Sequence, residues 1–336
     1  MKSFGYFDDA AREYVITDPC TPVKWTNYIG TLAFGGFIDQ TGGMLICRGD
    51  PALNRITKYL TQDPPSEFRA TTLYLRRPTG DGTYTVFSPL YVPTLQPLDC
   101  YECHIGLGYT TFITEIMGIR TQVRVFVPPG ESLVIQQVTV TNLAEEGQSL
   151  DVIPVVEYTH PDALKQLTNA DWVPQTMGSH LDEDEGGLKV LSQAAFMFKD
   201  IRRNYFTASL PVSSFETDRH AFLGAHGYGT WASPLSLQKD QLGNSLAVRG
   251  DNIAALMIHL GTLQPGQSRS LILLLGQTEN MADAMSAIRG IRKKDQVEGA
   301  FRELGASWDD ILSAAQVKTP DADMNRLLNI HNLRQC

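Results

Sequence analysis

Apolar and polar positions alternate along most of the chain, from about residue 4 to residue 276. Within residues 134–142, Val134, Val138 and Val140 share one face and polar side chains occupy the other, the period of two of a half-buried strand. Similar short runs, rich in β-branched and aromatic residues and bounded by turn-forming residues, recur throughout this region. Because no helical periodicity lies between them, the pattern predicts a mainly β fold, a large antiparallel sandwich, rather than a parallel α/β sheet.

Two local pairings of strands are predicted from the turns. The apolar run at residues 150–158 follows residues 134–142 after a polar turn, and we expect these two strands to be antiparallel neighbours. Residues 253–260 and 270–275 flank the tripeptide Gln-Pro-Gly at residues 264–266, which suits a type II turn. This second pair is predicted to be a hairpin.

The periodicity changes near residue 277, where apolar residues begin to recur three or four positions apart. These positions are Met281, Met285, Ile288, Val297, Phe301, Leu304, Trp308, Ile311, Leu312 and Ala315. The spacing predicts two or three amphipathic helices. Ser307 with Asp310 approximates a capping box, and Thr319 before Pro320 predicts a further helix that begins near residue 320.

The last predicted helix carries an apolar stripe formed by Met324, Leu327, Leu328 and His331. A single terminal helix cannot bury such a stripe by itself. We therefore expect another part of the protein, or a partner, to cover it.

Composition and charge exclude several classes of protein. The 336 residues include 28 Lys and Arg against 37 Asp and Glu, a formal net charge of −9, which argues against nucleic acid or an anionic membrane as the main partner. No apolar stretch approaches the roughly 18 to 20 residues that span a bilayer. The N-terminus lacks the pattern of a secretory signal, and five cysteines are a low, odd number. We expect a globular, cytoplasmic protein.

One short motif suggests cofactor chemistry. Residues Cys100 to His104 match the C-x-x-C-H of covalent haem attachment, but that chemistry requires an oxidising compartment. No second Cys/His pair stands at zinc-binding spacing, and the residues that follow are a poor helix start for a redox pair. We interpret Cys100 and Cys103 as structural. Gly106 and Gly108 lack the third glycine of a dinucleotide-binding loop.

Two other segments offer only weak candidates. The acidic residues 182–187 lack the alternating spacing of a calcium-binding loop, and we interpret them as a solvated loop. His220 and His226 lie in or next to the Gly- and aromatic-rich residues 222–231, which could rim a sugar site by stacking. Single histidines in β proteins are more often structural, and we favour that interpretation.

Several separate motifs resemble one enzyme family. They are residues 4–17 (FGYFDDAAREYVIT), 27–30 (NYIG), 55–59 (RITKY), 101–103 (YEC), 106–110 (GLGYT), 215–219 (FETDR) and 222–224 (FLG). In this order, over nearly the whole chain, they resemble the N-terminal portion of the glycoside hydrolase family 94 phosphorylases. That family includes cellobiose, cellodextrin and chitobiose phosphorylases and modules of cyclic β-1,2-glucan synthase.

The resemblance implies three parts. Residues 1–276 would form a β-supersandwich of the galactose-mutarotase-like kind, residues 277–318 a helical linker, and residues 319–336 the truncated start of an (α/α)6 catalytic barrel. In the family, the aspartic acid that donates a proton and the residues that hold sugar and phosphate lie in the barrel. No catalytic residue is therefore expected in this chain.

The resemblance also implies a reaction for the complete enzyme. In inverting phosphorolysis, a carboxylic acid protonates the glycosidic oxygen while phosphate attacks the anomeric carbon from the opposite face. The family would convert a β-linked glucoside and inorganic phosphate to a sugar 1-phosphate and a free sugar, without another cofactor or a metal. This chain alone is expected to be inactive.

Partners and substrate-proximal residues follow from the same resemblance. The expected partners are a β-linked oligosaccharide, the catalytic barrel in cis or in trans, and a second copy in a homodimer. The candidates for residues near the substrate are Trp25, Tyr101, Glu102, His104 and Tyr109.

Two alternatives remain open from the residues. The chain could be a stand-alone carbohydrate-binding or dimerisation module, in which aromatic side chains stack on sugars: Trp25, Tyr101, Tyr109, Tyr228 and Trp231. It could also be an aldose epimerase, since mutarotases share the sandwich and need a histidine and a carboxylate as acid and base. His104, His160 and Glu157 would supply those groups, but no mutarotase signature accompanies them.

Overall fold

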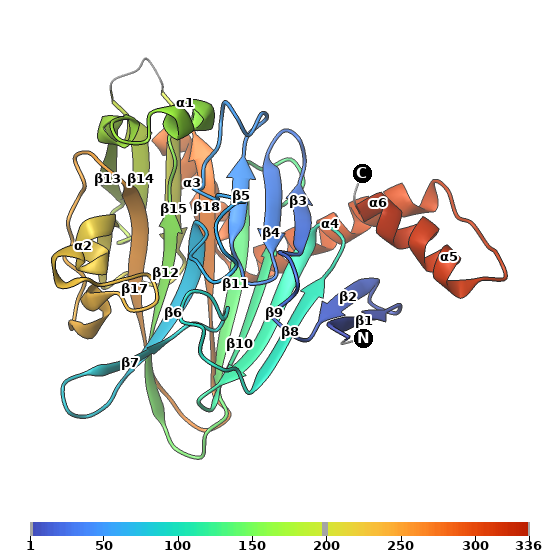
Figure 1. Cartoon of the computed structure of the whole chain (residues 1–336), viewed down its shortest axis with the longest axis horizontal. Helices are drawn as coiled ribbons and strands as arrows, with labels where there is room; N and C mark the ends of the chain where they lie inside the picture. Colours follow the sequence, from blue (N-terminus) through green and yellow to red (C-terminus); the bar gives the residue numbers. More distant parts are fainter. Residues whose placement is uncertain (1–2, 197–200, 335–336) are drawn as a thin grey trace.

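Two antiparallel sheets face each other in the computed structural model, which describes residues 3–196 and 201–334 (Figure 1). The larger sheet has ten strands among these residues. In spatial order they are β1 (Gly5–Asp8), β2 (Glu13–Ile16), β8 (Cys100–Ile105), β9 (Tyr109–Ile116), β10 (Ile119–Phe126), β11 (Leu133–Asn142), β18 (Ser268–Thr278), β15 (Arg203–Ala208), β14 (Lys189–Ala195) and β13 (Met177–Glu183). The predicted antiparallel β-sandwich is confirmed.

Two smaller sheets complete the sandwich. The second sheet contains β16 (Ser214–Asp218), β17 (Asn252–Leu263), β12 (Gln148–Glu157), β6 (Thr71–Pro78) and β7 (Tyr84–Phe87). The third contains β3 (Thr26–Gly30), β4 (Gly35–Asp39) and β5 (Met44–Cys47). Apolar side chains from all three sheets meet in one core, whose burial is the main stabilising contribution to the fold.

Strand β11 shows how the alternating pattern is used. Val134, Val138 and Val140 are fully buried in the core between the sheets, as the sequence predicts. The opposite face of the strand is also buried, because Leu133 and Ile135 pack against helices. The ten-stranded sheet therefore has a covered outer face, although strand alternation alone predicts only one buried face.

Both predicted strand pairings are wrong. Strand β11 pairs with β10 and β18, whereas β12 pairs with β17 and β6, so the chain changes sheets at each of the two turns. The buried Asn142 joins the two crossings. Its side-chain Nδ2 atom donates to the carbonyl of Leu263 at 2.8 Å, and its backbone carbonyl accepts from the amide of Gly266 at 2.8 Å. Gly266 adopts the predicted positive φ, but the turn links strands of opposite sheets.

Two helices cover the outer face of the ten-stranded sheet. They are α3 (Met281–Ile291) and α4 (Lys294–Ser313) (Figure 1). The guanidinium of Arg124 on β10 lies 3.9 Å from the ring centroid of Phe301 and pairs with Glu298 at 2.6 Å. The predicted capping box is wrong: Ser307 lies inside α4, where its hydroxyl donates to the carbonyl of Leu304 at 2.8 Å. The apolar stripe keeps packing on the sheet, so the helix continues through this position.

The C-terminal segment projects from the sandwich (Figure 1). It consists of α5 (Ala322–Arg326), a π-helical turn η4 (Leu327–His331) and α6 (Asn332–Arg334). The predicted N-cap at Thr319 is wrong by two residues, because the Asp321 carboxylate accepts from the amides of Asp323 and Met324 at 2.9 and 3.1 Å. Residues 335–336 of the expected barrel start lie outside the described residues.

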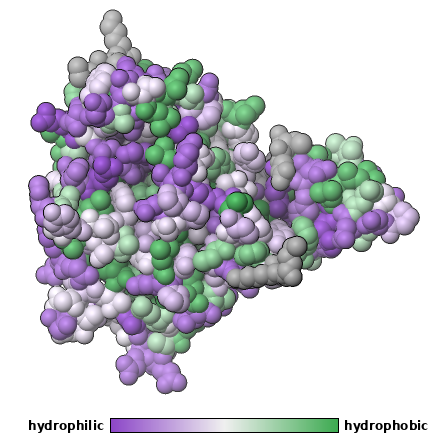
Figure 2. Space-filling model, viewed as in Figure 1, coloured by the Kyte–Doolittle hydropathy of each residue, from purple (hydrophilic) through white to green (hydrophobic). Residues whose placement is uncertain are grey.

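Within the described chain the apolar stripe of this segment is covered at His331, whose ring lies 4.8 Å from that of Phe7, but not at its other members. Met324, Leu327 and Leu328 are all exposed, and Figure 2 shows apolar side chains on the projecting part. No helix among the described residues is long and apolar enough to cross a membrane.

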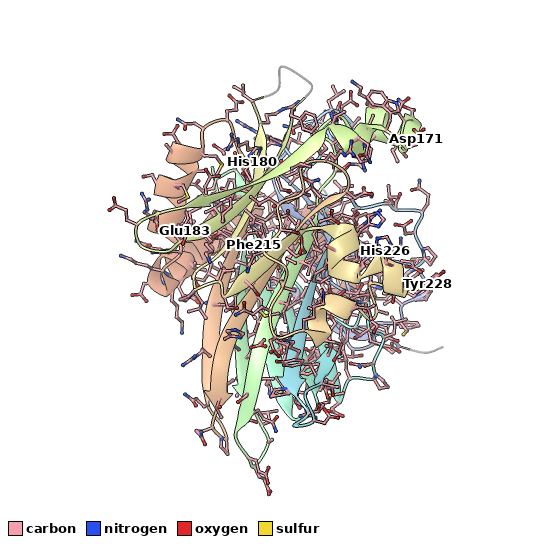
Figure 3. All side chains as sticks on the ribbon, turned by 90° about the vertical axis from the view of Figure 1, so that its left-hand side faces the viewer. Asp171, His180, Glu183, Phe215, His226 and Tyr228 are labelled. Carbon is pink, nitrogen blue, oxygen red and sulfur yellow. The ribbon has the colours of Figure 1, made fainter. Side chains whose placement is uncertain are left out.

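Short helices and loops cover the outer face of the five-stranded sheet. The helices of the described loops are α1 (Ala163–Thr168), η1 (Val173–Thr176), α2 (Arg219–Leu223), η2 (Ala225–Gly227) and η3 (Leu235–Gln238). Phe222 and Leu237 belong to a second apolar cluster there, and the ring of Trp231 stacks on Phe68 at a centroid distance of 3.8 Å. Tyr228 projects from this layer with His226 and is 92% exposed (Figure 3).

Candidate functional site

A cleft of about 960 Å³ separates the first strands of the sandwich from the C-terminal helices. The side chains that line it come from three parts of the chain. They are Phe7, Tyr14, Ile16, Trp25, Thr26, Asn27, Tyr28, Ile105, Asp323, Arg326, Leu327, His331 and Arg334. A concave, mainly apolar site with a few polar groups is the usual form of a small-molecule site.

Aromatic side chains form one wall of the cleft. Phe7 and Tyr14 are opposite residues of the β1–β2 hairpin, and their rings meet edge to face at 4.9 Å. Tyr14 contacts Trp25 at a ring distance of 6.0 Å. The Gln40 side chain fixes Trp25 from below, since its Oε1 atom accepts from the Trp25 amide at 3.1 Å. The hairpin register therefore brings the aromatic residues of the opening motif to one surface.

Asn27 is a buried polar residue beside the same cleft. Its Nδ2 atom donates to the carbonyls of Gly106 and Tyr109, at 3.2 and 2.7 Å, and to the Thr110 hydroxyl at 3.1 Å. The residue is 1% exposed, and its Oδ1 atom has no hydrogen-bond partner among the described residues. Because backbone carbonyls only accept, they fix the amide nitrogen on their side and leave Oδ1 as an unsatisfied acceptor.

Cationic side chains form the opposite wall. The Arg326 guanidinium binds both carboxylate oxygens of Asp9 and one oxygen of Asp323, the latter at 2.6 Å. The Arg326 guanidinium also lies 5.0 Å from the centroid of the Phe7 ring. The centroid of the His331 ring lies 4.8 Å from that of the same Phe7 ring. Burial and the neighbouring arginines lower the pKa of His331. This wall is attached to the sandwich mostly through polar contacts.

Arg334 differs from Arg326 in its partners. Its Nη2 atom donates to the carbonyl of Arg12 at 2.9 Å, while its buried Nε atom has no partner among the described residues. No carboxylate of the residues that the structure describes lies within ion-pair distance of Arg334. Burial lowers the pKa of the Arg334 guanidinium. Within residues 3–196 and 201–334, the Arg334 guanidinium therefore forms no ion pair.

A hydrogen-bonded cluster lies on the other face of β2 and β8, close to the cleft. His104 Nδ1 contacts Glu13 Oε2 at 2.7 Å, His104 Nε2 contacts Glu102 Oε2 at 3.2 Å, and the Tyr109 hydroxyl donates to Glu13 Oε1 at 2.6 Å. Burial raises the pKa of Glu13, but the hydrogen bonds from His104 and Tyr109 outweigh it and the net shift is downward. The hydrogen bond to Glu13 raises the pKa of His104.

The structure separates the five candidates that the sequence suggests. Trp25 lines the cleft, and Glu102, His104 and Tyr109 belong to the hydrogen-bonded cluster. Tyr101 points the other way: it is buried in the core, and its hydroxyl donates to the carbonyl of Gln40. The alternation along β8 accounts for this split.

The haem-like pentapeptide and the glycine pair have structural explanations. Cys103 packs in the core between the sheets, whereas Cys100 is only partly buried, and burial raises the pKa of both thiols. A Cβ atom at Gly106 would lie 2.1 Å from the Tyr109 ring. Gly108 has φ +72°, and its Cβ atom would lie 2.6 Å from the indole nitrogen of Trp308. Close packing therefore accounts for both glycines.

Sequence reasoning missed most of the cleft. Phe7, Tyr14 and Asn27 lie within family motifs that carry no mark of a site, and no sequence pattern points to Arg334. Hairpin geometry within residues 4–17 could have placed the two aromatic rings opposite each other. No local signal could have brought Arg334 to the N-terminal strands.

The residues of the epimerase alternative belong to separate networks. Glu157 accepts from Lys58 at 3.0 Å and from Arg219 at 2.9 Å. The backbone amide of His160 donates to the Gln166 side chain. His104 is held by Glu13 and Glu102 of the ten-stranded sheet, so its two ring nitrogens are directed to these glutamates and not to Glu157.

Comparison with known proteins agrees with the predicted resemblance. The model of the glycosyl hydrolase 94 supersandwich domain matches residues 12–294. The N,N'-diacetylchitobiose phosphorylase of Vibrio furnissii is 28% identical over 99% of this chain and 40% of the relative. The 3-O-beta-D-glucopyranosyl-beta-D-glucuronide phosphorylase of Paenibacillus borealis is 26% identical over 98% of this chain and 40% of the relative.

A solved structure supports the fold. A bacterial glucoamylase complexed with acarbose matches over 87% of this chain and 38% of the glucoamylase chain, with a TM-score of 0.56 and 8% identity.

The chain spans about 40% of the length of the phosphorylases that it matches. Because the domain model covers most of its residues, this chain belongs to the glycosyl hydrolase 94 family, through its supersandwich domain.

Proposed function

We propose that this chain is the N-terminal sandwich and linker of an inverting glycoside phosphorylase that acts on β-linked glucosides. The observation that carries the proposal is the match to phosphorylases along 98–99% of this chain but only 40% of theirs. The missing part of such an enzyme would supply the catalytic barrel, in the same polypeptide or in another. Inorganic phosphate would be the co-substrate of the complete enzyme, and the products a sugar 1-phosphate and a free sugar.

The chemistry of the cleft supports inactivity of this chain alone. Inverting phosphorolysis needs a carboxylic acid that is protonated before it meets the glycosidic oxygen. Asp323 lines the cleft and Asp9 lies beside it, but both bind Arg326. The hydrogen bond from Arg326 lowers the pKa of Asp9, which disfavours proton donation. Neither carboxylate is suited to act as the general acid.

The uncovered C-terminal stripe supports a barrel partner. Met324 and Leu328 lie on α5 and η4, outside the sandwich core, and are exposed to solvent; Leu327 is exposed as well and lines the cleft. Burying them would contribute free energy to an interface. In this proposal residues 319–336 begin the barrel, Trp25 lies near the substrate, the enzyme is a cytoplasmic homodimer, and the barrel covers the stripe.

The test has two parts. The purified chain is incubated with a panel of β-linked disaccharides and inorganic phosphate, and release of sugar 1-phosphate is measured; we expect none. The same assay is then applied to the open reading frame continued beyond the codon for residue 336, and we expect phosphorolysis. Activity of the chain alone would overturn the inactivity, and an immediate stop codon with no barrel gene nearby would overturn the assignment as part of a phosphorylase.

A further inference from the structure

We propose that the end of the sandwich around α1 binds a second copy of this chain across a two-fold axis. The proposal rests on the proposed function only in expecting a homodimer, and it adds the surface through which the two copies associate. Three features carry it: an inverted helix, an apolar patch around that helix, and two opposite charges at the ends of the patch. All three lie away from the projecting C-terminal segment (Figure 1).

Helix α1 is inverted with respect to an ordinary surface helix. Its buried residues are Ala163 and Gln166, whereas Leu164 and Leu167 are 58% and 56% exposed. A surface helix of a globular protein ordinarily turns its apolar stripe toward the core and its polar residues toward water. In α1 the two leucines, three positions apart, instead form an apolar face that is directed to solvent.

Polar contacts hold α1 in this orientation. The Gln166 Oε1 atom accepts from the Thr159 hydroxyl at 2.8 Å, and the Ala163 amide donates to the Ala52 carbonyl at 2.9 Å. Rolling the helix to bury its leucines would break these bonds, and a buried polar group that loses its partner costs more than the bond contributes. The leucines are therefore buried by docking of another surface, not by rearrangement of the helix.

Further exposed apolar side chains extend the face on both sides of α1. They are Leu53, Trp172 and Val248, which are between 45% and 79% exposed. The turn that carries Leu53 is bound to α1 through the Ala52 carbonyl. The segment that carries Val248 is bound to η1, since the Gly250 amide donates to the Pro174 carbonyl at 3.0 Å. Figure 2 shows apolar side chains at the top of the molecule, where α1 lies. Such a patch marks an interaction site, and tryptophan is a typical anchor of protein interfaces.

Two charged side chains of opposite sign lie at the ends of the patch. Asp50 precedes Leu53 in the turn beside α1, and Arg249 follows Val248 in the segment beside η1. Both are exposed, and neither forms an ion pair within residues 3–196 and 201–334. A two-fold axis through α1 exchanges the two ends, so Asp50 of one copy faces Arg249 of the other. The surface is therefore complementary to itself, with an apolar centre and an ion pair at each end.

Sedimentation velocity of the full 336-residue chain over a dilution series tests for the dimer. We expect dimer to convert to monomer on dilution. The double variant Leu164→Gln, Leu167→Gln should raise the dissociation constant about tenfold or more, because glutamine keeps the helix but removes the apolar face. Leu143→Gln is the control and should leave the constant unchanged: Leu143 is 48% exposed but precedes β12, whereas α1 follows it.

Charge reversal tests the two-fold arrangement. Asp50→Arg and Arg249→Asp should each weaken the dimer, because each places like charges together at both ends of the patch. Combining the two substitutions restores opposite charges and should recover the wild-type dissociation constant. The Asp50 carboxylate also accepts from the Ala52 amide at 2.7 Å, but loss of that bond cannot account for such a recovery, since it is absent from the combined variant as well.

Three outcomes would overturn the proposal. The first is a chain that stays monomeric throughout the dilution series. The second is a dimer that the double variant of α1 leaves unchanged, because its interface would then lie elsewhere. The third is a combined charge variant that is as weak as the single ones. All the substituted residues are exposed, so the variants should keep the fold, which circular dichroism checks.

Failure here and failure of the proposed function are distinguishable. Association is measured on this chain without turnover, whereas the proposed function is measured as phosphorolysis by the continued open reading frame. Phosphorolysis without association through α1 would refute the surface and keep the enzyme assignment. Association through α1 without phosphorolysis would do the reverse.

Discussion

The Asp39 carboxylate offers the sharpest test of how the region beneath the cleft is stabilised. It is fully buried, and its Oδ2 atom accepts from Arg69 Nε at 2.7 Å and from the Tyr59 hydroxyl at 3.0 Å. Its Oδ1 atom accepts from the amide and hydroxyl of Thr41, both at 2.9 Å, and from the amide of Gly43 at 3.1 Å. Five donors therefore converge on one carboxylate, and Asp39→Asn would disturb this arrangement with little change in shape.

The size of the effect follows from what asparagine cannot do. In the place of Oδ2, an amide nitrogen would face the donor atoms of Arg69 and Tyr59 and could not accept from them. The Arg69 side chain, which is 1% exposed, would remain buried without its carboxylate counterion. Removing one partner of a buried ion pair costs about 3–5 kcal/mol. Arg69 keeps its hydrogen bonds to the carbonyls of Pro64, Pro65 and Glu67, which favours the lower end of that range. We expect a loss of about 3 kcal/mol in the free energy of unfolding.

Urea denaturation followed by circular dichroism measures this change. Asp171→Asn, at an exposed position (Figure 3), is the control and should stay within about 0.5 kcal/mol of the wild type. The next residue, Gln40, supports Trp25 and Tyr101, so Asp39→Asn should also loosen the cleft. A loss below about 1 kcal/mol with an unchanged denaturant slope would refute the argument that the carboxylate neutralises a buried charge.

Three further perturbations probe the contacts around the cleft. Gly108→Ala should lower the free energy of unfolding more than Gly130→Ala, measured by urea denaturation. Both glycines have a positive φ, which costs another residue about 1–3 kcal/mol of backbone strain. At Gly108, but not at Gly130, the added Cβ atom would also clash with the indole ring of Trp308 on α4. His104→Gln should remove stability mainly between about pH 4.5 and 6.5, measured as unfolding midpoints against pH. The pKa of His104 is raised in the folded state, so its contribution to stability is complete below about 6.5 and is lost as the pH rises through the raised value. The pKa of Glu13 is lowered, so its contribution is complete above about 4.5 and is lost as the pH falls through the lowered value. Arg326→Gln should speed hydrogen exchange in residues 322–334 and leave the global midpoint unchanged, because its ion pairs are at the surface.

The sequence predicts individual strands well and their pairing poorly. Alternation places Val134, Val138 and Val140 correctly because burial on one face is a local property. The same alternation cannot say which strand lies beside which. A strand of either sheet presents an apolar face to the shared core, so a turn between two such strands fits a hairpin and a change of sheet equally well. In the structure the bonds of Asn142 to Leu263 and Gly266 tie the two crossings together, and they join residues far apart in the chain.

Helix boundaries fail for a related reason. Ser307 and Thr319 both carry local capping signals, but the stripe that contains Trp308 continues to pack on the sheet past Ser307. At the second position, Asp321 competes with Thr319 as the cap and accepts two amide hydrogen bonds. Local signals give the type of element, and packing decides where it begins.

The motifs at residues 4–17, 27–30 and 106–110 meet at one edge of the sandwich, whereas those at residues 55–59 and 215–219 meet elsewhere, where Lys58 and Arg219 both bind Glu157. Tyr14 and Asn27 come from two motifs and line the cleft, and Asn27 binds the backbone of a third motif at Gly106 and Tyr109. These contacts are internal to the sandwich, so the packing of this edge accounts for the motif residues that make them, and a motif match of this kind identifies a fold without marking a ligand site. Among the described atoms of these motif residues, Asn27 Oδ1 is buried without a hydrogen-bond partner.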